Sequence, residues 1–269
     1  MPKAKIDDIE IHYDIHGDGP PVLLVAGLGG AGSYWAPQVE PLSKHFKVIV
    51  YDHRGTGQST HQKTRYTVEG MARDVLGLLD SLKIDDVHLI GHSTGGAIGQ
   101  VLGIEAPQRL RSIVMYASWT KSDPFMHRVM EVRKAAVLNG GAMAYLRATP
   151  VFLHPSWWVN ANWQKLEEME AKAVAAFPDP EIAASRIDMV LAFDRTADLH
   201  KIRTPTLVVC AEDDFLTPAY FSHQLTAAIP GARLVLMEKG GHAASQTMTE
   251  EFNRIVTGYV LEQERRHAL

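Results

Sequence analysis

The sequence predicts an α/β fold in which a mostly parallel sheet carries helices on both faces. Short apolar runs of strand length alternate with segments of helical periodicity through the first 118 residues, and this alternation returns after residue 200. The runs are apolar at consecutive positions, as expected of strands that are covered on both sides. With 269 residues, of which 46% are hydrophobic, the chain is long enough to bury a large core.

The expected elements follow one another along the chain. Strands are predicted at residues 9–13, 22–26, 47–51, 87–90, 110–115, 206–210 and 232–236. A helix is predicted over residues 67–82, because apolar side chains recur there close to every 3.6 residues and Thr67 suits the N-cap. A second helix, over residues 94–105, begins at glycines and stops before Pro107.

Residues 119–200 break this rhythm, because they contain helical patterns and no convincing strand. Helices are predicted at residues 124–138, 142–148, 157–175 and 180–193. We therefore expect residues 1–118 and 201–269 to form one core domain and residues 119–200 to form a helical cap over the carboxyl edge of the sheet. Trp157 and Trp158 lie in this cap, where they either line a pocket or pack the cap onto the core.

Charge and cysteine content exclude several classes of protein. Lysine and arginine number 27 and aspartate and glutamate 31, so the net charge of −4 argues against a nucleic-acid binder. The single cysteine, Cys210, excludes an intrachain disulfide framework and a multi-cysteine zinc site. The N-terminus has no apolar signal region, and no apolar run is long enough to span a bilayer. We expect a cytoplasmic protein without metal, organic cofactor or membrane partner, and a homodimer on base rates alone.

The sharpest motif is the pentapeptide Gly91-His92-Ser93-Thr94-Gly95, which follows a predicted strand and opens a predicted helix. This is the G-x-S-x-G nucleophile elbow in the context that it requires. Such a turn lifts the Ser93 hydroxyl above the sheet and directs the Thr94 amide at an anion formed there. His92 lies inside the elbow, where it is either structural or part of the pocket lining. The incidental alternative is a glycine-rich turn that happens to contain a serine.

A nucleophilic serine needs a base and an acid that orients the base. His242 follows two glycines at the end of the last predicted strand, which makes it the strongest candidate among the 13 histidines. Glu212, Asp213 and Asp214 follow the preceding strand, and the pattern alone does not choose between them. All of these residues come just after strands, at the sheet edge where ligands bind in open α/β folds.

The glycine loop at residues 27–32 has two interpretations. Its G-x-G-x-x-G spacing after a strand, with Asp52 about twenty residues on, is typical of a dinucleotide site. Pro37 follows too soon for the long helix that such a site needs, and this interpretation leaves the elbow unexplained. We instead expect the loop to supply a second oxyanion donor, the amide of Leu28. Gly27 would let the backbone approach the reacting carbonyl, and Trp35 would lie near the pocket mouth.

Taken together, the motifs resemble the α/β-hydrolase superfamily. They are AGLGG at residues 26–30, YDHRGTGQS at 51–59, GHSTGG at 91–96, EDDFLTP at 212–218 and GGH at 240–242. The resemblance implies an eight-stranded, mostly parallel sheet and a Ser-His-Asp triad. In this family the acid stands four residues before the proline of its loop, which implies Asp214, before Pro218.

Two further segments resemble one group within this superfamily. AGLGGAGSYW at residues 26–35 and NGGAMAYLRATPVFLHPSWW at 139–158 are similar to the aminoacrylate hydrolases of pyrimidine-ring degradation, also described as carbamate hydrolases and here called RutD-like. This resemblance implies a small enamine, amide or carbamate as substrate. YTVEGMARDVLGLLDSL at 66–82 also resembles enol-lactonases of aromatic catabolism, so lactone or carboxylic-ester hydrolysis is the alternative. A non-catalytic ligand-binding member of the fold is the alternative from another class.

Two features stay open at the level of sequence. Ser93 either forms an acyl-enzyme or only assists a water that His242 and Asp214 activate. Arg147, Arg186 and Arg195 in the cap are candidates to bind a substrate carboxylate, although a solvated surface position is the more ordinary interpretation of each.

Overall fold

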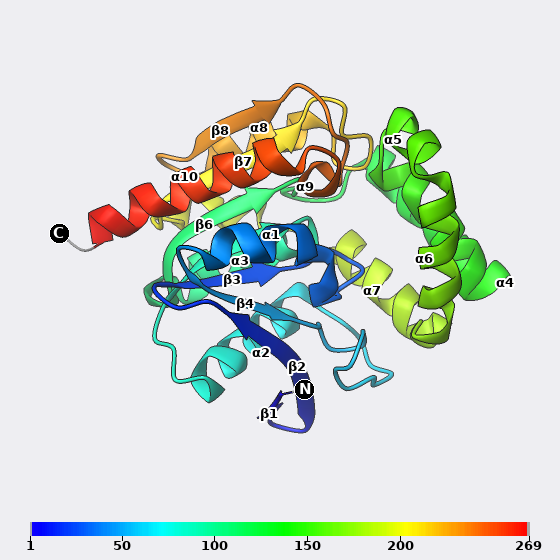
Figure 1. Cartoon of the computed structure of the whole chain (residues 1–269), viewed down its shortest axis with the longest axis horizontal. Coiled ribbons are helices and arrows are strands. Elements are labelled where there is room, and N and C mark those ends of the chain that lie inside the picture. The colour runs from blue at the N-terminus through cyan, green and yellow to red at the C-terminus, as the bar shows by residue number, and fades with distance from the viewer. Residues whose placement is uncertain (1, 268–269) are drawn as a thin grey trace.

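A central sheet of eight strands runs through the computed structural model, which describes residues 2–267 (Figure 1). The strands are β1 (Lys3–Ile6), β2 (Ile9–His16), β3 (Pro21–Val25), β4 (Lys47–Tyr51), β5 (Val87–His92), β6 (Leu110–Tyr116), β7 (Thr206–Ala211) and β8 (Arg233–Met237). Their order in the sheet is β1-β2-β4-β3-β5-β6-β7-β8. The pairs β1–β2 and β2–β4 are antiparallel and all the other pairs are parallel. The predicted eight-stranded, mostly parallel sheet is confirmed.

Strand β1 is the strand of this sheet that the sequence pattern missed. Its four residues pair with β2 from Lys3 opposite His12 to Ile6 opposite Ile9, through a tight turn in which Asp7 has a φ of +51°. Two of the four residues are lysines, so the apolar pattern is too short to predict a strand. Pairing with the longer β2 supplies the order that the local sequence lacks.

Helices cover both faces of the sheet, which explains the continuous apolar strands. In β3, Leu23 and Val25 belong to one buried cluster and Val22 and Leu24 to another. The first cluster includes residues of α2 (Val68–Ser81), α3 (Thr94–Glu105) and α8 (Ala219–Ala228). The second includes residues of η1 (Gly32–Trp35), α1 (Ala36–Ser43), α9 (Ala244–Thr247) and α10 (Thr249–His267).

Between β6 and β7 the chain is helical, and we call residues 119–200 the cap segment. Its helices are α4 (Pro124–Leu153), α5 (Ser156–Ala161), α6 (Trp163–Ala175) and α7 (Pro180–Ala192), and η3 (Thr196–Lys201) lies at its end. The short η2 (Pro107–Arg109) precedes β6. Helices α4 to α7 stand beside one end of the sheet (Figure 1). Gly141, with a φ of +71°, interrupts α4 between the two helices expected there. A break at Asn162 divides the single helix expected over residues 157–175.

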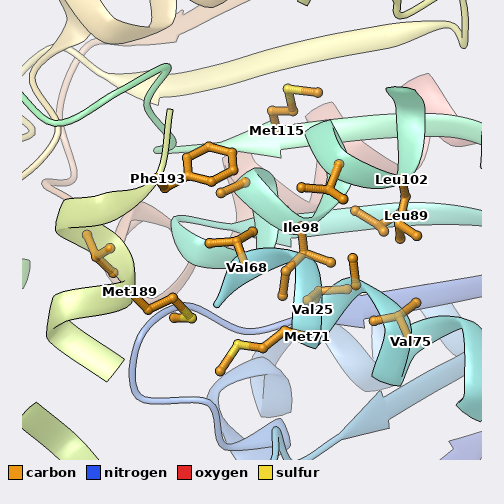
Figure 2. Packing of buried hydrophobic residues seen from close by; sticks show 14 of the residues in the cluster. Val25, Val68, Met71, Val75, Leu89, Ile98, Leu102, Met115, Met189 and Phe193 are labelled. Atoms are coloured by element: carbon orange, nitrogen blue, oxygen red, sulfur yellow. The ribbon is translucent and has the colours of Figure 1, made fainter. Parts of the chain in front are cut away.

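Local chemistry explains where the cap helices begin. The carboxylate of Asp123 accepts a hydrogen bond from the Met126 amide at 2.8 Å, with Pro124 in the first turn of α4. Asp179 caps α7 in the same way. Side chains at the end of α7, Met189 and Phe193, join the core cluster that contains Val25 (Figure 2). The cap segment is therefore fixed to the core at its base. Over residues 2–267, no helix is both long and apolar enough to cross a membrane.

Candidate active site

The turn between β5 and α3 has the geometry of a nucleophile elbow. Ser93 adopts φ +52° and ψ −112°, a strained conformation for a residue with a side chain. A Cβ on Gly91 would lie 2.3 Å from the backbone carbonyl of Gly95, so the turn closes only with glycine at residue 91. The loops that carry Leu28, Ser93, Asp214 and His242 follow β3, β5, β7 and β8 and meet at the carboxyl edge of the parallel strands.

The backbone of His242 is fixed by two hydrogen bonds that its carbonyl oxygen accepts. The Tyr116 hydroxyl donates a hydrogen bond to this oxygen at 2.8 Å, and the His92 Nε2 donates another at 3.0 Å. Burial, reinforced by the nearby His242, holds the pKa of His92 well below its usual range, so His92 is neutral. His92 therefore connects the elbow to the loop of His242 by a hydrogen bond from a neutral ring. The same ring stacks on that of Tyr34, with ring centroids 4.5 Å apart.

The structure separates the three acidic candidates. Asp214 is 2% exposed, and its Oδ2 lies 3.0 Å from Nδ1 of His242. Its Oδ1 accepts hydrogen bonds from the amides of Leu216 at 2.8 Å and Thr217 at 2.9 Å. Asp213 instead accepts the amide of Gly241 at 2.7 Å, and Glu212 is exposed. Only Asp214 of the three contacts the imidazole, while Asp213 fixes the loop that presents it.

Two backbone amides beside Ser93 have no acceptor among residues 2–267: those of Leu28 and Thr94. Thr94 is the first residue of α3, where an amide lacks an intrahelical partner. Leu28 belongs to the glycine loop after β3, which packs closely on the elbow: a Cβ on Gly27 would lie 3.2 Å from the Cβ of Ser93. Both residues line the same cleft, so each amide is a candidate donor for an oxyanion site.

The same glycine loop differs from a dinucleotide site. A four-residue helix, η1, follows it in place of a long helix. Asp52 does not face a ribose, because its carboxylate accepts the amides of Gly32 at 2.8 Å and Gln58 at 2.9 Å. The spacing of Asp52 from the glycines therefore reflects a contact that joins two loops of the core.

Arg186 of α7 is buried, contrary to the surface position that the sequence suggested. It is 2% exposed, and its Nη2 donates to the Leu28 carbonyl at 2.7 Å and its Nη1 to the Arg54 carbonyl at 2.8 Å. Burial lowers the pKa of Arg186 to about 10. The other two cap arginines are placed differently: Arg147 is 66% exposed, and Arg195 pairs with Glu105 at 2.6 Å. Arg186 thus connects the cap segment to the backbone of the glycine loop.

A cleft of about 980 Å³ opens onto these groups. The predicted site residues that line it are Gly27, Leu28, His92, Ser93, Thr94 and His242. Side chains of the cap segment close it from the other side; they include Met130, Arg133, Leu146, Met169 and Phe177. The lining is mostly apolar with a few convergent polar groups, as in small-molecule sites. The described part of the chain holds no group of three or more His, Cys, Asp or Glu side chains suited to a metal ion.

Three predicted pocket residues lie outside this lining. Trp35 is fully buried under α10, where it packs against Phe252 with ring centroids 6.2 Å apart. Trp157 is 44% exposed, with the Lys239 amine 5.7 Å from its ring. Trp158 stacks on His154 at 4.4 Å. The large aromatic surface of each is used in packing, which is the more common role of tryptophan.

No hydrogen bond connects Ser93 Oγ with His242 in the described chain, although both side chains line the cleft. Such bonds are often long in unliganded hydrolases and shorten when substrate binds. No sequence pattern pointed to Tyr116 and Thr217, whose hydroxyls contact the His242 carbonyl and Asp214 Oδ2. Arg133 was not predicted either, although its sequence position carries a signal: it occupies a buried position on the apolar face of α4.

Fold and site together define a known class of protein. The family described as alpha/beta hydrolase fold matches residues 20–246, and the chain belongs to this family. Among curated proteins it is similar to "Putative carbamate hydrolase RutD" of Azorhizobium caulinodans, with 42% identity over 96% of this chain and 98% of the relative. A protein of the same name from Pseudomonas syringae is 40% identical over 94% and 98%.

A solved structure gives the same result for the fold. The enol-lactonase from Burkholderia xenovorans superposes with a TM-score of 0.89 and 29% identity, over 97% of this chain and all of that one. With the two curated relatives, these comparisons confirm the resemblance inferred from the motifs, including its narrower RutD-like part. The chain is a hydrolase of the α/β-hydrolase fold.

Proposed function

We propose that the cleft is the active site of a serine hydrolase. Ser93 is the nucleophile, His242 the general base, and Asp214 the acid that orients the imidazole. One observation carries the proposal: a serine on a strained elbow shares a cleft with a histidine whose Nδ1 lies 3.0 Å from a buried carboxylate. The order Ser, Asp, His along the chain is the order typical of this fold.

The proposed reaction proceeds in two half-reactions. Ser93 Oγ forms a bond to the carbonyl carbon of the substrate while His242 Nε2 takes the hydroxyl proton. The negative oxygen of the tetrahedral intermediate accepts hydrogen bonds from the amides of Leu28 and Thr94. His242 then gives its proton to the leaving amine or alcohol as the carbonyl–heteroatom bond breaks. A water molecule, deprotonated by His242, attacks the acyl-enzyme and releases the acid and Ser93.

The substrate that we propose is a small carbonyl compound with a C–N bond, such as a carbamate, amide or enamine. The names of the curated relatives, which share about 40% identity over nearly the whole chain, favour this class. Lactone or ester hydrolysis is the second candidate, and the likeness to an enol-lactonase at a TM-score of 0.89 favours it. Carbamates, amides, lactones and esters share this serine chemistry and differ in the leaving group. An enamine has no carbonyl–nitrogen bond, so its hydrolysis to a carbonyl compound and an amine would use a water molecule that His242 and Asp214 activate.

The test of the mechanism is covalent labelling of the pure protein with a small fluorophosphonate, followed by intact-mass measurement. We expect one adduct per chain that maps to Ser93 and is absent from Ser93→Ala. Ser33→Ala removes an exposed serine that follows the glycine loop and should keep the adduct. Turnover of an activated acetate ester should fall about 10⁴-fold or more in Ser93→Ala and in His242→Ala.

Each other outcome has a defined meaning. Ester turnover that survives in Ser93→Ala excludes Ser93 as nucleophile. If Ser93→Ala and His242→Ala both lose turnover but no adduct forms, His242 and Asp214 activate water directly and Ser93 only assists. A folded wild-type protein with neither adduct nor turnover supports a non-catalytic, ligand-binding member of the fold. Parallel assays with a small carbamate and a small lactone then separate the two substrate classes.

A further inference from the structure

Arg133, in the first half of α4, carries a buried charge on the wall of the cleft. Its side chain comes from the apolar face of the helix and the residue is 4% exposed. Arg133 lines the same cleft as Ser93 and His242. Arg133 belongs to α4, in the cap segment, whereas Ser93 and His242 follow strands β5 and β8.

The guanidinium of Arg133 is only partly occupied by protein groups. Its Nη2 donates to the Tyr145 hydroxyl at 2.7 Å, and its carbon lies 5.1 Å from the Tyr145 ring centroid and 5.9 Å from that of Phe152. The Nε is buried and has no hydrogen-bond partner in residues 2–267. Within the same range, no carboxylate lies within ion-pair distance of this arginine.

Neighbouring cations of the same helix show the ordinary arrangement. Lys134, the next residue, donates to the carboxylate of Asp188 at 2.7 Å. Arg147 is 66% exposed and pairs with Glu170 at 4.0 Å. Arg186, the other buried arginine of the cleft, uses its donors on two backbone carbonyls. Arg133 is therefore the buried cation of this cleft that keeps hydrogen-bond donors free for a ligand.

A buried charge without a counter-ion is costly, and a bound anion removes that cost. The planar fork of a guanidinium matches a carboxylate in two parallel hydrogen bonds. We propose that Arg133 binds a carboxylate of the substrate and so selects small acids whose scissile carbonyl group reaches Ser93. This inference rests on the proposed function, because it assigns the cleft to the substrate. It adds a specificity-determining residue in the cap segment.

The test compares two activated esters of matched size: the mono-4-nitrophenyl ester of succinic acid, which carries a carboxylate, and 4-nitrophenyl butyrate, which is neutral. We expect the wild type to favour the acidic ester. Arg133→Met should lower kcat/KM for the acidic ester by about 10- to 150-fold, the range for a lost hydrogen bond to a charged group. For the neutral ester the change should be less than about threefold.

Two more variants keep the result interpretable. Arg133→Lys fills the same space and keeps the charge but lacks the fork, so its preference should lie between wild type and Arg133→Met. Arg147→Met removes an exposed arginine of the same helix and should leave both esters unchanged. Equal losses on both esters in Arg133→Met and Arg133→Lys would assign Arg133 a structural role and overturn the inference.

The outcome also distinguishes this inference from the proposed function. Turnover of the neutral ester that depends on Ser93 supports the serine mechanism whatever Arg133 does. If neither ester is hydrolysed, the serine mechanism fails and Arg133 is tested by binding. Free succinate should then raise the melting temperature of wild type and of Arg147→Met, but not that of Arg133→Met. An equal rise in all three proteins would exclude Arg133 as the carboxylate site.

Discussion

The contact between Arg186 and the Leu28 carbonyl predicts that a residue of the cap segment controls the proposed oxyanion site. Arg186 donates to this oxygen from Nε at 3.2 Å and from Nη2 at 2.7 Å. The Leu28 amide, which we propose as an oxyanion donor, belongs to the same short loop. Replacing Arg186 by methionine keeps most of the side-chain volume and removes the donors. The loop would then lose the groups that fix its orientation.

The expected magnitudes follow from these contacts. Arg186→Met leaves the buried carbonyls of Leu28 and Arg54 without these donors. Each lost donor should lower the free energy of unfolding by about 1–3 kcal/mol. Burial lowers the pKa of Arg186 to about 10, so the folded protein disfavours the charged guanidinium by roughly 3 kcal/mol. That cost disappears in the variant, so we expect a net destabilisation of no more than about 3 kcal/mol. Loss of one oxyanion donor lowers kcat by about 10²- to 10³-fold.

The assay measures kcat, KM and thermal stability together, with an activated ester as substrate. In Arg186→Met we expect kcat to fall about 100-fold while KM changes less than about threefold, because the Leu28 amide acts mainly in the transition state. Arg186→Lys should recover part of kcat. Arg195→Met removes a cap cation that pairs with Glu105 away from the loop and should leave kcat unchanged. A variant of lowered stability with unchanged kcat would refute the reasoning.

Three further outcomes are expected. Gly91→Ala should destabilise the protein by about 3 kcal/mol or more in urea unfolding, because its Cβ would meet backbone of Gly95 at 2.3 Å; a stable variant would contradict the elbow geometry. Thr217→Val should lower kcat/KM about tenfold, because the hydroxyl 2.8 Å from Asp214 Oδ2 is lost, and Thr217→Ser should restore it. Burial lowers the pKa of His154 to about 4, so the unfolded chain binds the extra proton between about pH 6.5 and 4. Stability should therefore fall as the pH drops through this window, by about 3 kcal/mol from this residue, and His154→Phe should flatten the slope measured by unfolding at several pH values.

Much of the fold follows from local sequence patterns. The apolar runs predicted strands β2 to β8, and the helical periodicities predicted α2, α3 and the helices of the cap segment, mostly to within a few residues. Strand β1 was missed because four residues with two lysines give no pattern, and order arises from pairing with β2. The break at Asn162 was also missed, because both sides of it have helical periodicity.

The proposed triad residues could be found from sequence because each follows a strand end. The choice among Glu212, Asp213 and Asp214 needed either a resemblance or the fold, since adjacent carboxylates differ only in the direction that the loop gives them. The expectation for Trp35 was wrong for a similar reason. Its position after the glycine loop suggested the pocket mouth, but η1 turns its ring away, under α10.

The sequence by itself determined the α/β class, the elbow motif, the glycine loop and the candidates for the proposed triad, because these depend on backbone conformation and on periodicities within a few residues. Only the tertiary structure decided which buried cation of the cleft keeps a hydrogen-bond donor without a protein acceptor in residues 2–267. Arg133 and Arg186 stand at similar positions on the apolar faces of their helices. Arg186 donates to the carbonyls of Leu28 and Arg54, whereas Arg133 keeps a donor without an acceptor in the described part of the chain. The difference arises because the hydrogen-bond partners of each guanidinium come from chain segments that lie far away in sequence.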